Sequence, residues 1–315
     1  MGKIAFVFSG QGAQYEGMGK ELNTIPECRE VFKAADKALG FSLSHMCFEG
    51  SKDELNKTEN TQPAVLTVSI AAMKALESYG VNPDITAGLS LGEYSALVCS
   101  KVIDFKEAVS LVRKRGTYME EAVPQGEGTM AAIIGLKKDK IKEVIEGAKP
   151  FGKVEVSNIN CPGQIVIGGE VKAVEKACEI AKEKRALKCV MLKVSGPFHT
   201  SMLKKAADKL YDNLKNIEMN NIEIPVVTNV TGNFIEDKDK IKDTLKKQVM
   251  TTVLWEDCVN TMLNDGVDVF IELGPSKVLS SFIKKVNRKV KILNVEDLKS
   301  LDKTVNELKN LGYIK

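Results

Sequence analysis

Short apolar runs alternate with longer amphipathic stretches along most of this sequence. Residues 4–8 form an apolar run that ends in Ser9 and Gly10, which predicts a buried strand followed by a turn. Similar apolar strands are predicted at residues 85–87, 224–227 and 267–271. Helices are predicted between them, at residues 21–39, 63–76, 93–98 and 277–285. Strands that alternate with helices in this way indicate a mainly parallel α/β sheet.

Two prolines set where the first helices are expected to begin. Pro26 divides the helical pattern of residues 21–39 or marks a new start, because proline lacks the N–H that a helix interior uses. Pro63 is expected to open the helix that runs to residue 76, since its fixed φ suits a first helical position.

The middle of the chain follows a different rhythm. Its expected order is strand, helix, strand, strand, helix, strand, at residues 130–134, 138–148, 154–156, 164–167, 171–184 and 189–194. This order is the split arrangement of ferredoxin-like folds. The α/β pattern resumes afterwards. We therefore expect a subdomain of residues 126–195 inserted into a large domain formed by residues 1–125 and 196–315.

The composition is that of a globular protein, and the charge narrows the classes of partner. Of 315 residues, 43% are hydrophobic and 28% are charged, which argues against disordered, collagen-like and coiled-coil chains. Lysine and arginine number 45 against 42 aspartates and glutamates, which gives a net charge of +3. A balance so near zero argues against a broad nucleic-acid surface.

Neither the cysteines nor the first residues indicate secretion. The seven cysteines are scattered without a CxxC pair, which argues against a zinc ribbon and against a thioredoxin-type site. Reduced thiols in a cytosolic protein explain them most simply. The sequence runs from Met1 straight into an apolar strand with no signal-peptide layout, and no run approaches the ~20 apolar residues of a spanning helix. We therefore expect a cytoplasmic protein without a membrane segment.

The strongest chemical motif is Gly-Leu-Ser-Leu-Gly at residues 88–92, between a predicted strand and a predicted helix. A serine on such a sharp turn exposes its hydroxyl, while the small glycines let the strand and the helix approach each other. The N–H of Leu91 lies at the helix start, where it can point toward a developing oxyanion. The motif predicts Ser90 as a nucleophile, against the alternative that a five-residue pattern arose by chance.

Only two histidines are available to activate this serine. His45 is expected to be a surface or partly packed residue. His199 follows Gly-Pro-Phe in a loop where the inserted subdomain ends, and it is the predicted base. Asp104 and Asp139 are the only aspartates between Ser90 and His199, and neither lies in a convincing acid loop. A Ser–His dyad oriented by a backbone carbonyl is the alternative to a triad, and it would suit an activated thioester.

A second glycine-rich segment follows the first strand, from Gly10 to Tyr15. A dinucleotide-binding fingerprint would need a third glycine where Tyr15 stands, and no Gly-Lys-Ser/Thr follows as a P-loop requires. The loop is instead a candidate source of a second oxyanion N–H donor.

Several segments together resemble one known family, the malonyl-CoA:acyl-carrier-protein transacylases. They are GQGAQ at 10–14, GLSLGEYS at 88–95, INCPGQ at 159–164, GPFHT at 196–200 and ELGP at 272–275. Each motif alone is moderately specific, but their order and spacing over nearly the whole chain are highly specific. The resemblance implies a hydrolase-like α/β domain that carries a ferredoxin-like subdomain, in agreement with the pattern above.

The resemblance also implies roles for individual residues. Ser90 would be the acylated nucleophile, and His199 would be its general base and acid. The backbone N–H groups of Gln11 and Leu91 would form the oxyanion hole. Arg115 would bind the free carboxylate of the malonyl group.

The remaining implied residues surround this centre. The backbone carbonyl of Gln248 would orient the histidine, which would explain the missing acid. Asn160 would line the site, and Phe198 would leave little space for an α-methyl group on the substrate. Leu89 departs from the family, in which many members have histidine at this position, and we expect altered packing there without lost chemistry.

An arginine suits the proposed carboxylate on physical grounds. Malonyl differs from acetyl by one carboxylate, which a planar guanidinium can bind through two parallel hydrogen bonds. In a dry cleft such a pair is worth ~2–5 kcal/mol, enough to discriminate against uncharged acyl chains. The alternative from the sequence alone is that Arg113 and Arg115 merely solvate a helix face.

The implied activity is malonyl transfer from malonyl-CoA to the phosphopantetheine thiol of acyl carrier protein, for fatty acid synthesis. The expected partners are acyl carrier protein and malonyl-CoA, with no nucleic acid, no membrane, no metal and no other cofactor. One alternative is a discrete acyltransferase that serves a polyketide synthase, and another is a serine thioesterase or esterase. A catalytically silent nucleotide-binding or scaffold module is a third, which Tyr15 and the presence of Ser90, His199 and Arg115 argue against.

Overall fold

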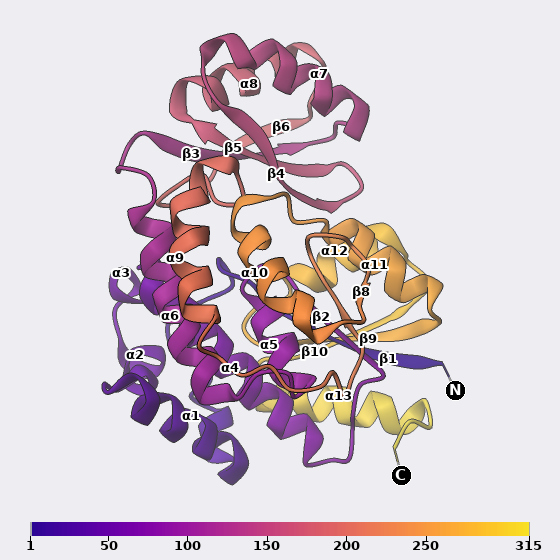
Figure 1. The fold of residues 1–315 in the computed structure, drawn as a ribbon. Coiled ribbons are helices and arrows are strands. Elements are labelled where there is room, and N and C mark those ends of the chain that lie inside the picture. The colour runs from indigo at the N-terminus through magenta and orange to yellow at the C-terminus, as the bar shows by residue number, and fades with distance from the viewer. Residues whose placement is uncertain (1, 315) are drawn as a thin grey trace.

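Two β-sheets organise the structure, a computed structural model that describes residues 2–314 (Figure 1). Within those residues the larger sheet has six strands in the order β10-β9-β1-β2-β7-β8. They are β1 (Lys3–Phe8), β2 (Ile85–Gly88), β7 (Val226–Val227), β8 (Phe234–Ile235), β9 (Val267–Leu273) and β10 (Lys291–Val295). Neighbouring strands are parallel except for β7 with β8, so the prediction of a mainly parallel α/β sheet is confirmed.

Strand β1 lies inside the larger sheet and is buried on both faces. Phe6 and Phe8 pack into the cluster that contains α4 (Thr58–Glu77), whereas Ala5 and Val7 pack with α11 (Trp255–Asn264) and α12 (Val278–Val286). Successive side chains of a strand point to opposite faces of its sheet. An unbroken apolar run is therefore what a strand covered on both faces requires.

Further helices complete the layers around this sheet. They are α1 (Pro26–Leu39), α2 (Leu43–Glu49), α3 (Lys52–Leu55), α5 (Gly92–Cys99), α6 (Phe105–Glu121), α9 (Lys204–Leu214), α10 (Ile241–Met250) and α13 (Leu298–Asn310). Among them, α6 lies against both α4 and α9.

The smaller sheet is antiparallel and is drawn at the top of Figure 1, with its two helices on the outer side. Its strands follow the order β4-β5-β3-β6. Its elements are β3 (Gly128–Ile134), α7 (Lys138–Ala148), β4 (Val154–Cys161), β5 (Gln164–Glu170), α8 (Val171–Glu183) and β6 (Lys188–Met191). This βαββαβ order confirms the predicted fold class. The exact limits of the domains, at residues 126 and 195, stay a prediction.

The two sheets meet where β4 runs beside the segment that joins α10 to α11. Val253 donates its N–H to the carbonyl of Ser157 and accepts the N–H of Ile159. The hydroxyl of Thr252 donates to the carbonyl of Val156. These bonds hold the smaller sheet over the carboxyl ends of β1 and β2, where the candidate site lies.

Pro63 does not open its helix, contrary to the prediction. α4 starts five residues earlier, at Thr58, and Pro63 lies inside it. The first turn is held by burial and by its own polar groups, because Thr61 is buried and donates its hydroxyl to the carbonyls of Leu55 and Lys57. Packing along this nearly all-buried helix outweighs the one backbone hydrogen bond that proline removes.

Two predicted strands are shorter than expected. The run at 224–227 contributes only Val226–Val227, because Pro225 has no N–H and the N–H of Ile224 donates to the hydroxyl of Ser100. The predicted strand at 189–194 ends at Met191. The chain then crosses to the loop that carries His199.

Candidate active site

Ser90 lies on the tight turn between β2 and α5, as the Gly-Leu-Ser-Leu-Gly motif predicts. Its φ is 53°, in the left-handed region that non-glycine residues rarely adopt. A Cβ at Gly88 would stand 2.0 Å from backbone atoms of Gly92, and a Cβ at Gly92 would stand 2.1 Å from the carbonyl oxygen of Phe8. Both flanking positions therefore require glycine, and the turn presents the Ser90 hydroxyl at the carboxyl edge of the sheet.

The hydroxyl of Ser90 contacts the predicted base. Ser90 Oγ lies 2.8 Å from His199 Nε2, and His199 Nδ1 lies 2.7 Å from the carbonyl oxygen of Gln248. Because a carbonyl oxygen only accepts, Nδ1 carries the proton and Nε2 is free to accept from Ser90. The structure thus orients the imidazole without a carboxylate. Asp104 instead caps the start of α6 through the N–H of Lys106.

Arg115 reaches the same hydroxyl from α6. Its Nη2 lies 3.0 Å from Ser90 Oγ and 3.0 Å from Gln248 Oε1, and its Nη1 lies 2.8 Å from Gln62 Oε1. The side chain is 1% exposed and stacks on the ring of Tyr94, with 5.3 Å from Cζ to the ring centroid. Burial lowers the pKa of Arg115 from its usual range, yet an arginine side chain keeps its charge in a protein.

The partners of this buried cation are neutral. Within residues 2–314, no carboxylate lies within ion-pair distance of Arg115, and its Nε has no hydrogen-bond partner. A buried charge is usually paired or bound to a ligand, because leaving water costs it solvation energy. The site is therefore built to receive an anion beside the nucleophile.

A cavity of about 200 Å³ opens onto Ser90 and His199 between the two sheets. Three other predicted site residues, Gln11, Asn160 and Phe198, line it. Asn160 is buried, and its Oδ1 has no hydrogen-bond partner among residues 2–314. Much of the remaining lining is apolar, so the cavity has the mixed character of a small-ligand site.

One predicted oxyanion donor follows the nucleophile directly in the chain, and the other reaches the same cavity from a distant loop. Leu91 directly follows Ser90 at the start of α5, and Gln11 lies in the loop after β1, next to the cavity. In the part of the chain that the structure describes, no hydrogen bond uses the backbone N–H of either residue. Both donors are thus available to a ligand.

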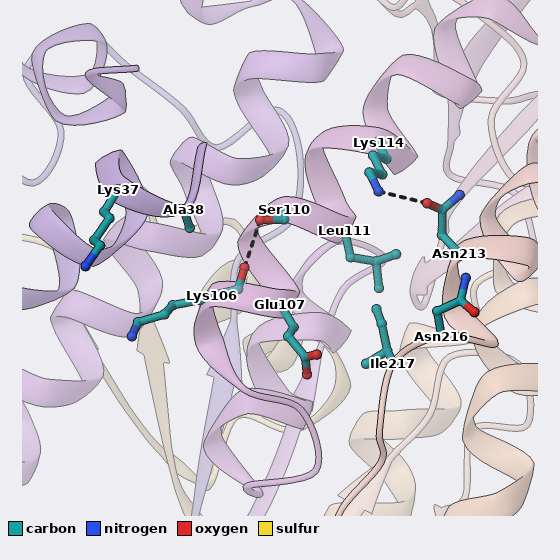
Figure 2. A pocket seen from close by; sticks show the side chains of 10 residues that line it. All are labelled: Lys37, Ala38, Lys106, Glu107, Ser110, Leu111, Lys114, Asn213, Asn216 and Ile217. Carbon is teal, nitrogen blue, oxygen red and sulfur yellow. Dashed lines mark hydrogen bonds between the residues drawn. The ribbon is translucent and has the colours of Figure 1, made fainter. Parts of the chain in front are cut away.

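A larger surface hollow lies elsewhere, between α1, α6 and the end of α9 (Figure 2). Its volume is about 520 Å³, and three lysines, Lys37, Lys106 and Lys114, line it. Figure 2 shows Lys114 bonded to Asn213, with an Nζ to Oδ1 distance of 2.9 Å. The hollow contains neither a histidine nor a cysteine, so the smaller cavity at Ser90 is the one equipped for nucleophilic chemistry.

Comparison with known proteins places the chain in a family. Residues 5–310 match the family model described as the acyl transferase domain. The chain belongs to the acyl transferase family. It is 46% identical over 311 residues to the malonyl CoA-acyl carrier protein transacylase of Bacillus subtilis, and the match covers 98% of each chain.

Solved structures agree with this membership. The crystal structure of malonyl CoA-acyl carrier protein transacylase from Clostridium perfringens superposes with a TM-score of 0.96 at 47% identity, covering 99% of this acyl transferase and 98% of that chain. A malonyl-transacylase in complex with its type II PKS acyl-carrier protein superposes with a TM-score of 0.94 at 39% identity, covering 97% and 99%. The predicted family is confirmed.

Three buried residues of this acyl transferase contact the site although no role was predicted for them. They are Gln62, Glu93 and Asn229. Gln62 bonds to Arg115 from α4, and Asn229 bonds to the backbone of Ser90 from the loop after β7. Glu93, next to the motif glycine Gly92, was the only one with a positional signal.

Residues 2–314 lack two features that would indicate other classes of protein. No cluster of three or more histidine, cysteine, aspartate or glutamate side chains is arranged to hold a metal ion there. No helix of that part of the chain has the length and apolar character needed to cross a membrane.

The environment of His199 predicts an unusual pH profile. Burial, reinforced by the charge of Arg115, lowers the pKa of His199 to about 3. A histidine with this pKa stays neutral, and so able to accept a proton, from pH 8 down to about pH 5, whereas one with the usual pKa of about 6.5 would be mostly protonated at pH 5. The pH dependence of kcat/KM reports the pKa values of the free enzyme. We therefore expect kcat/KM for an acyl-CoA substrate to stay level over this range. A fall with a midpoint near pH 6.5 would contradict the assignment.

Proposed function

We propose that this acyl transferase moves the malonyl group from malonyl-CoA to the phosphopantetheine thiol of acyl carrier protein, through a malonyl ester on Ser90. The observation that carries the proposal is a buried arginine that has no carboxylate partner among residues 2–314 and lies 3.0 Å from the hydroxyl of a serine–histidine pair. Relatives of 46% and 47% identity bear the name of this activity. The product would supply fatty acid synthesis in the cytoplasm.

The first half-reaction forms the acyl-enzyme. Ser90 Oγ attacks the thioester carbonyl of malonyl-CoA while His199 Nε2 accepts its proton. The carbonyl oxygen becomes an oxyanion, which the N–H groups of Gln11 and Leu91 would stabilise. The carbon–sulfur bond then breaks, and CoA leaves with the proton that the imidazolium returns.

The second half-reaction reverses these roles for a new thiol. His199 Nε2 accepts the proton of the carrier's phosphopantetheine thiol, whose sulfur attacks the malonyl ester of Ser90. The carbon–oxygen bond breaks, and the imidazolium returns a proton to Ser90 Oγ. Each bond is made and broken by groups of the chain and its two substrates, so we propose that no cofactor takes part.

Arg115 would select the malonyl group by its free carboxylate. The unpartnered Nε offers a donor for this carboxylate, and two glutamine oxygens hold the guanidinium in place without cancelling its charge. The bound carboxylate would also offset the positive charge that disfavours protonation of His199, so the substrate itself would make the base stronger. Phe198 and Asn160 would shape the wall beside the malonyl carbon.

Replacing Arg115 tests this selection. We expect Arg115→Ala to lower kcat/KM for malonyl-CoA by ~30- to ~4,000-fold, which corresponds to ~2–5 kcal/mol for a buried charge pair. The value for acetyl-CoA should change by less than ~10-fold, since acetyl has no carboxylate to bind. Steady-state kinetics with both thioesters measures the difference.

Arg113 offers the matched control for that experiment. It lies on the same helix but donates to Asn60 Oδ1 and stacks on the ring of Phe41, away from Ser90. Arg113→Ala should leave the ratio of malonyl to acetyl activity unchanged. Equal losses of malonyl and acetyl activity in Arg115→Ala would remove the carboxylate-binding role.

A product assay tests the function as a whole. The purified chain is given malonyl-CoA and acyl carrier protein with its phosphopantetheine attached, and the malonyl products are separated. We expect malonyl-carrier protein as the main product. Free malonate without malonyl-carrier protein would instead indicate a thioesterase.

A further inference from the structure

Asn229 lies directly in front of the serine turn, two residues beyond the end of β7. β7 pairs with β2 through Val226 with Thr86 and Val227 with Ala87, and the ladder stops there. Beyond it, the side chain of Asn229 makes the contacts. Its Oδ1 accepts the N–H of Ser90 at 2.6 Å, and its Nδ2 donates to the carbonyl of Gly88 at 2.7 Å.

These two contacts are those that the N–H and the carbonyl of one residue would make in a parallel ladder. One oxygen accepts an N–H from the neighbouring strand, and one nitrogen donates to a carbonyl two residues earlier on that strand. A backbone partner is not available here, because the chain leaves β2 in the left-handed conformation of Ser90. The side-chain amide of Asn229 therefore extends the sheet by one pairing step across the turn.

Asn229 is itself fixed on both sides of its backbone. Its N–H donates to Glu93 Oε2 at 2.7 Å, and its carbonyl accepts the N–H of Leu254 at 2.9 Å. Asn229 and Glu93 are 0% and 1% exposed. Glu93 lies in the first turn of α5, three residues after Ser90, so the contacts form a closed ring from Ser90 through Glu93 and Asn229 back to Ser90.

A second side-chain amide holds the other peptide group of the nucleophile. Gln248 Nε2 donates to the carbonyl of Ser90 at 3.0 Å. The backbone carbonyl of Gln248 also accepts a hydrogen bond from the N–H of His199 Nδ1, and its Oε1 accepts one from Arg115. Asn229 and Gln248 together fix the backbone of Ser90 on both sides, and Gln248 ties that backbone to the base.

We propose that Asn229 is a positioning residue for the nucleophile and that Glu93 acts through it. This inference rests on the proposed acyl transfer at Ser90. Without the Asn229 amide, the Ser90 N–H and the Gly88 carbonyl lose their partners, and the left-handed turn relaxes. Ser90 Oγ then moves away from His199 Nε2, and the N–H of Leu91 turns away from the oxyanion. The acylation step slows, while the contacts that hold Arg115 for substrate binding stay in place.

The test compares Asn229→Ala with the unaltered chain in rapid-quench labelling by malonyl-CoA. We expect the acylation rate constant per titrated active site to fall by ~10- to ~100-fold, the scale of loss that a displacement of about 1 Å causes. The affinity for malonyl-CoA is measured in Ser90→Ala and in the double variant that also carries Asn229→Ala. The two affinities should agree within about twofold. A purely structural role would lower the number of titrated sites and leave the rate per site unchanged, and that result overturns the proposal.

Thr304→Val is the matched control for loss of a buried polar contact. Thr304 is 1% exposed and donates its hydroxyl to the carbonyl of Asn294, in a helix remote from the cavity. We expect the acylation rate per site to be unchanged in this variant. A loss equal to that of Asn229→Ala would show a general packing effect and overturn the proposal.

Two variants of Glu93 keep the test decisive if Asn229→Ala does not fold. Glu93→Gln retains an oxygen that accepts the Asn229 N–H, and Glu93→Leu does not. Burial raises the pKa of Glu93 to about 7, so a neutral glutamine resembles one form of the natural side chain. Acylation within about threefold of the unaltered chain in Glu93→Gln, with a loss of at least ~10-fold in Glu93→Leu, supports the proposal. Equal rates in the two variants overturn it.

A fluorophosphonate probe separates this inference from the proposed function. The probe reacts with an activated serine and needs no malonyl group. If the unaltered chain takes no malonyl label, the proposed substrate is wrong, and the probe still tests Asn229. Slower probe labelling of Asn229→Ala than of Thr304→Val supports the positioning role, and equal labelling overturns it.

Discussion

Replacing Ser90 with alanine is expected to abolish the covalent malonyl-enzyme and to lower malonyl transfer by ~10⁴- to ~10⁶-fold, the scale on which serine enzymes lose activity without their nucleophile. Both His199 and Arg115 contact this hydroxyl, at 2.8 Å and 3.0 Å. The loss should be in the rate and not in binding, because Arg115 keeps its bonds to Gln62 and Gln248. Radiolabelled malonyl-CoA and denaturing gels measure the covalent label.

Ser95 supplies the matched control, in the helix α5 that follows the serine turn. It is fully buried, and its Oγ has no hydrogen-bond partner within residues 2–314. Ser95→Ala should therefore retain the malonyl label at full stoichiometry. Label that persists at full stoichiometry in Ser90→Ala would show that another residue is the nucleophile.

Replacing His199 with alanine is expected to slow acylation by ~10²- to ~10⁴-fold, the usual contribution of a general base. The variant removes the acceptor of the Ser90 proton and leaves the Gln248 carbonyl without its donor. The same histidine would serve the incoming thiol, so transfer from a preformed malonyl-enzyme to carrier protein should slow as well. Rapid-quench kinetics of each half-reaction measures both losses.

His45 is the natural control, since the sequence contains only two histidines. It lies on α2 and is exposed, which is one of the two alternatives that the sequence left open. His45→Ala should match the unaltered chain in both half-reactions. A loss below about threefold in His199→Ala, or a loss confined to one half-reaction, would contradict the single-base mechanism.

The serine turn could be predicted from sequence because its requirements are local. Gly88 and Gly92 are needed where the backbones of the strand and the helix nearly touch, and both lie within two residues of Ser90. The buried strand β1 was predictable for the same reason, since its apolar run is contiguous. The family resemblance then supplied the residues that local patterns could not.

The surroundings of the dyad could not be predicted locally. From the sequence alone, Arg115 on α6 looked equally like a side chain that merely solvates a helix face. Gln248 and Asn229 both contact Ser90, although they lie 158 and 139 residues from it in the sequence. The resemblance indicated only the backbone carbonyl of Gln248, whereas the structure shows its side chain bonded to both Arg115 and Ser90. Such contacts depend on how the two sheets pack.

The error at Pro63 has the same physical origin. A proline is locally a good first residue of a helix, and the prediction at Pro63 relied on that preference. In the structure the preceding residues are buried against neighbouring helices, and this tertiary packing extends α4 by five residues before the proline. Local preference is outweighed where a whole helix is enclosed.

Mass spectrometry of the intact protein gives the most direct test of the central claim, that Ser90 carries the malonyl group between two thiols. The chain is exposed to malonyl-CoA, weighed, digested to locate the adduct, and then mixed with phosphopantetheine-bearing acyl carrier protein. We predict one malonyl adduct per chain on the peptide that contains Ser90, and its complete passage to the carrier protein. An adduct on another residue, or one that leaves only as free malonate, would contradict the account.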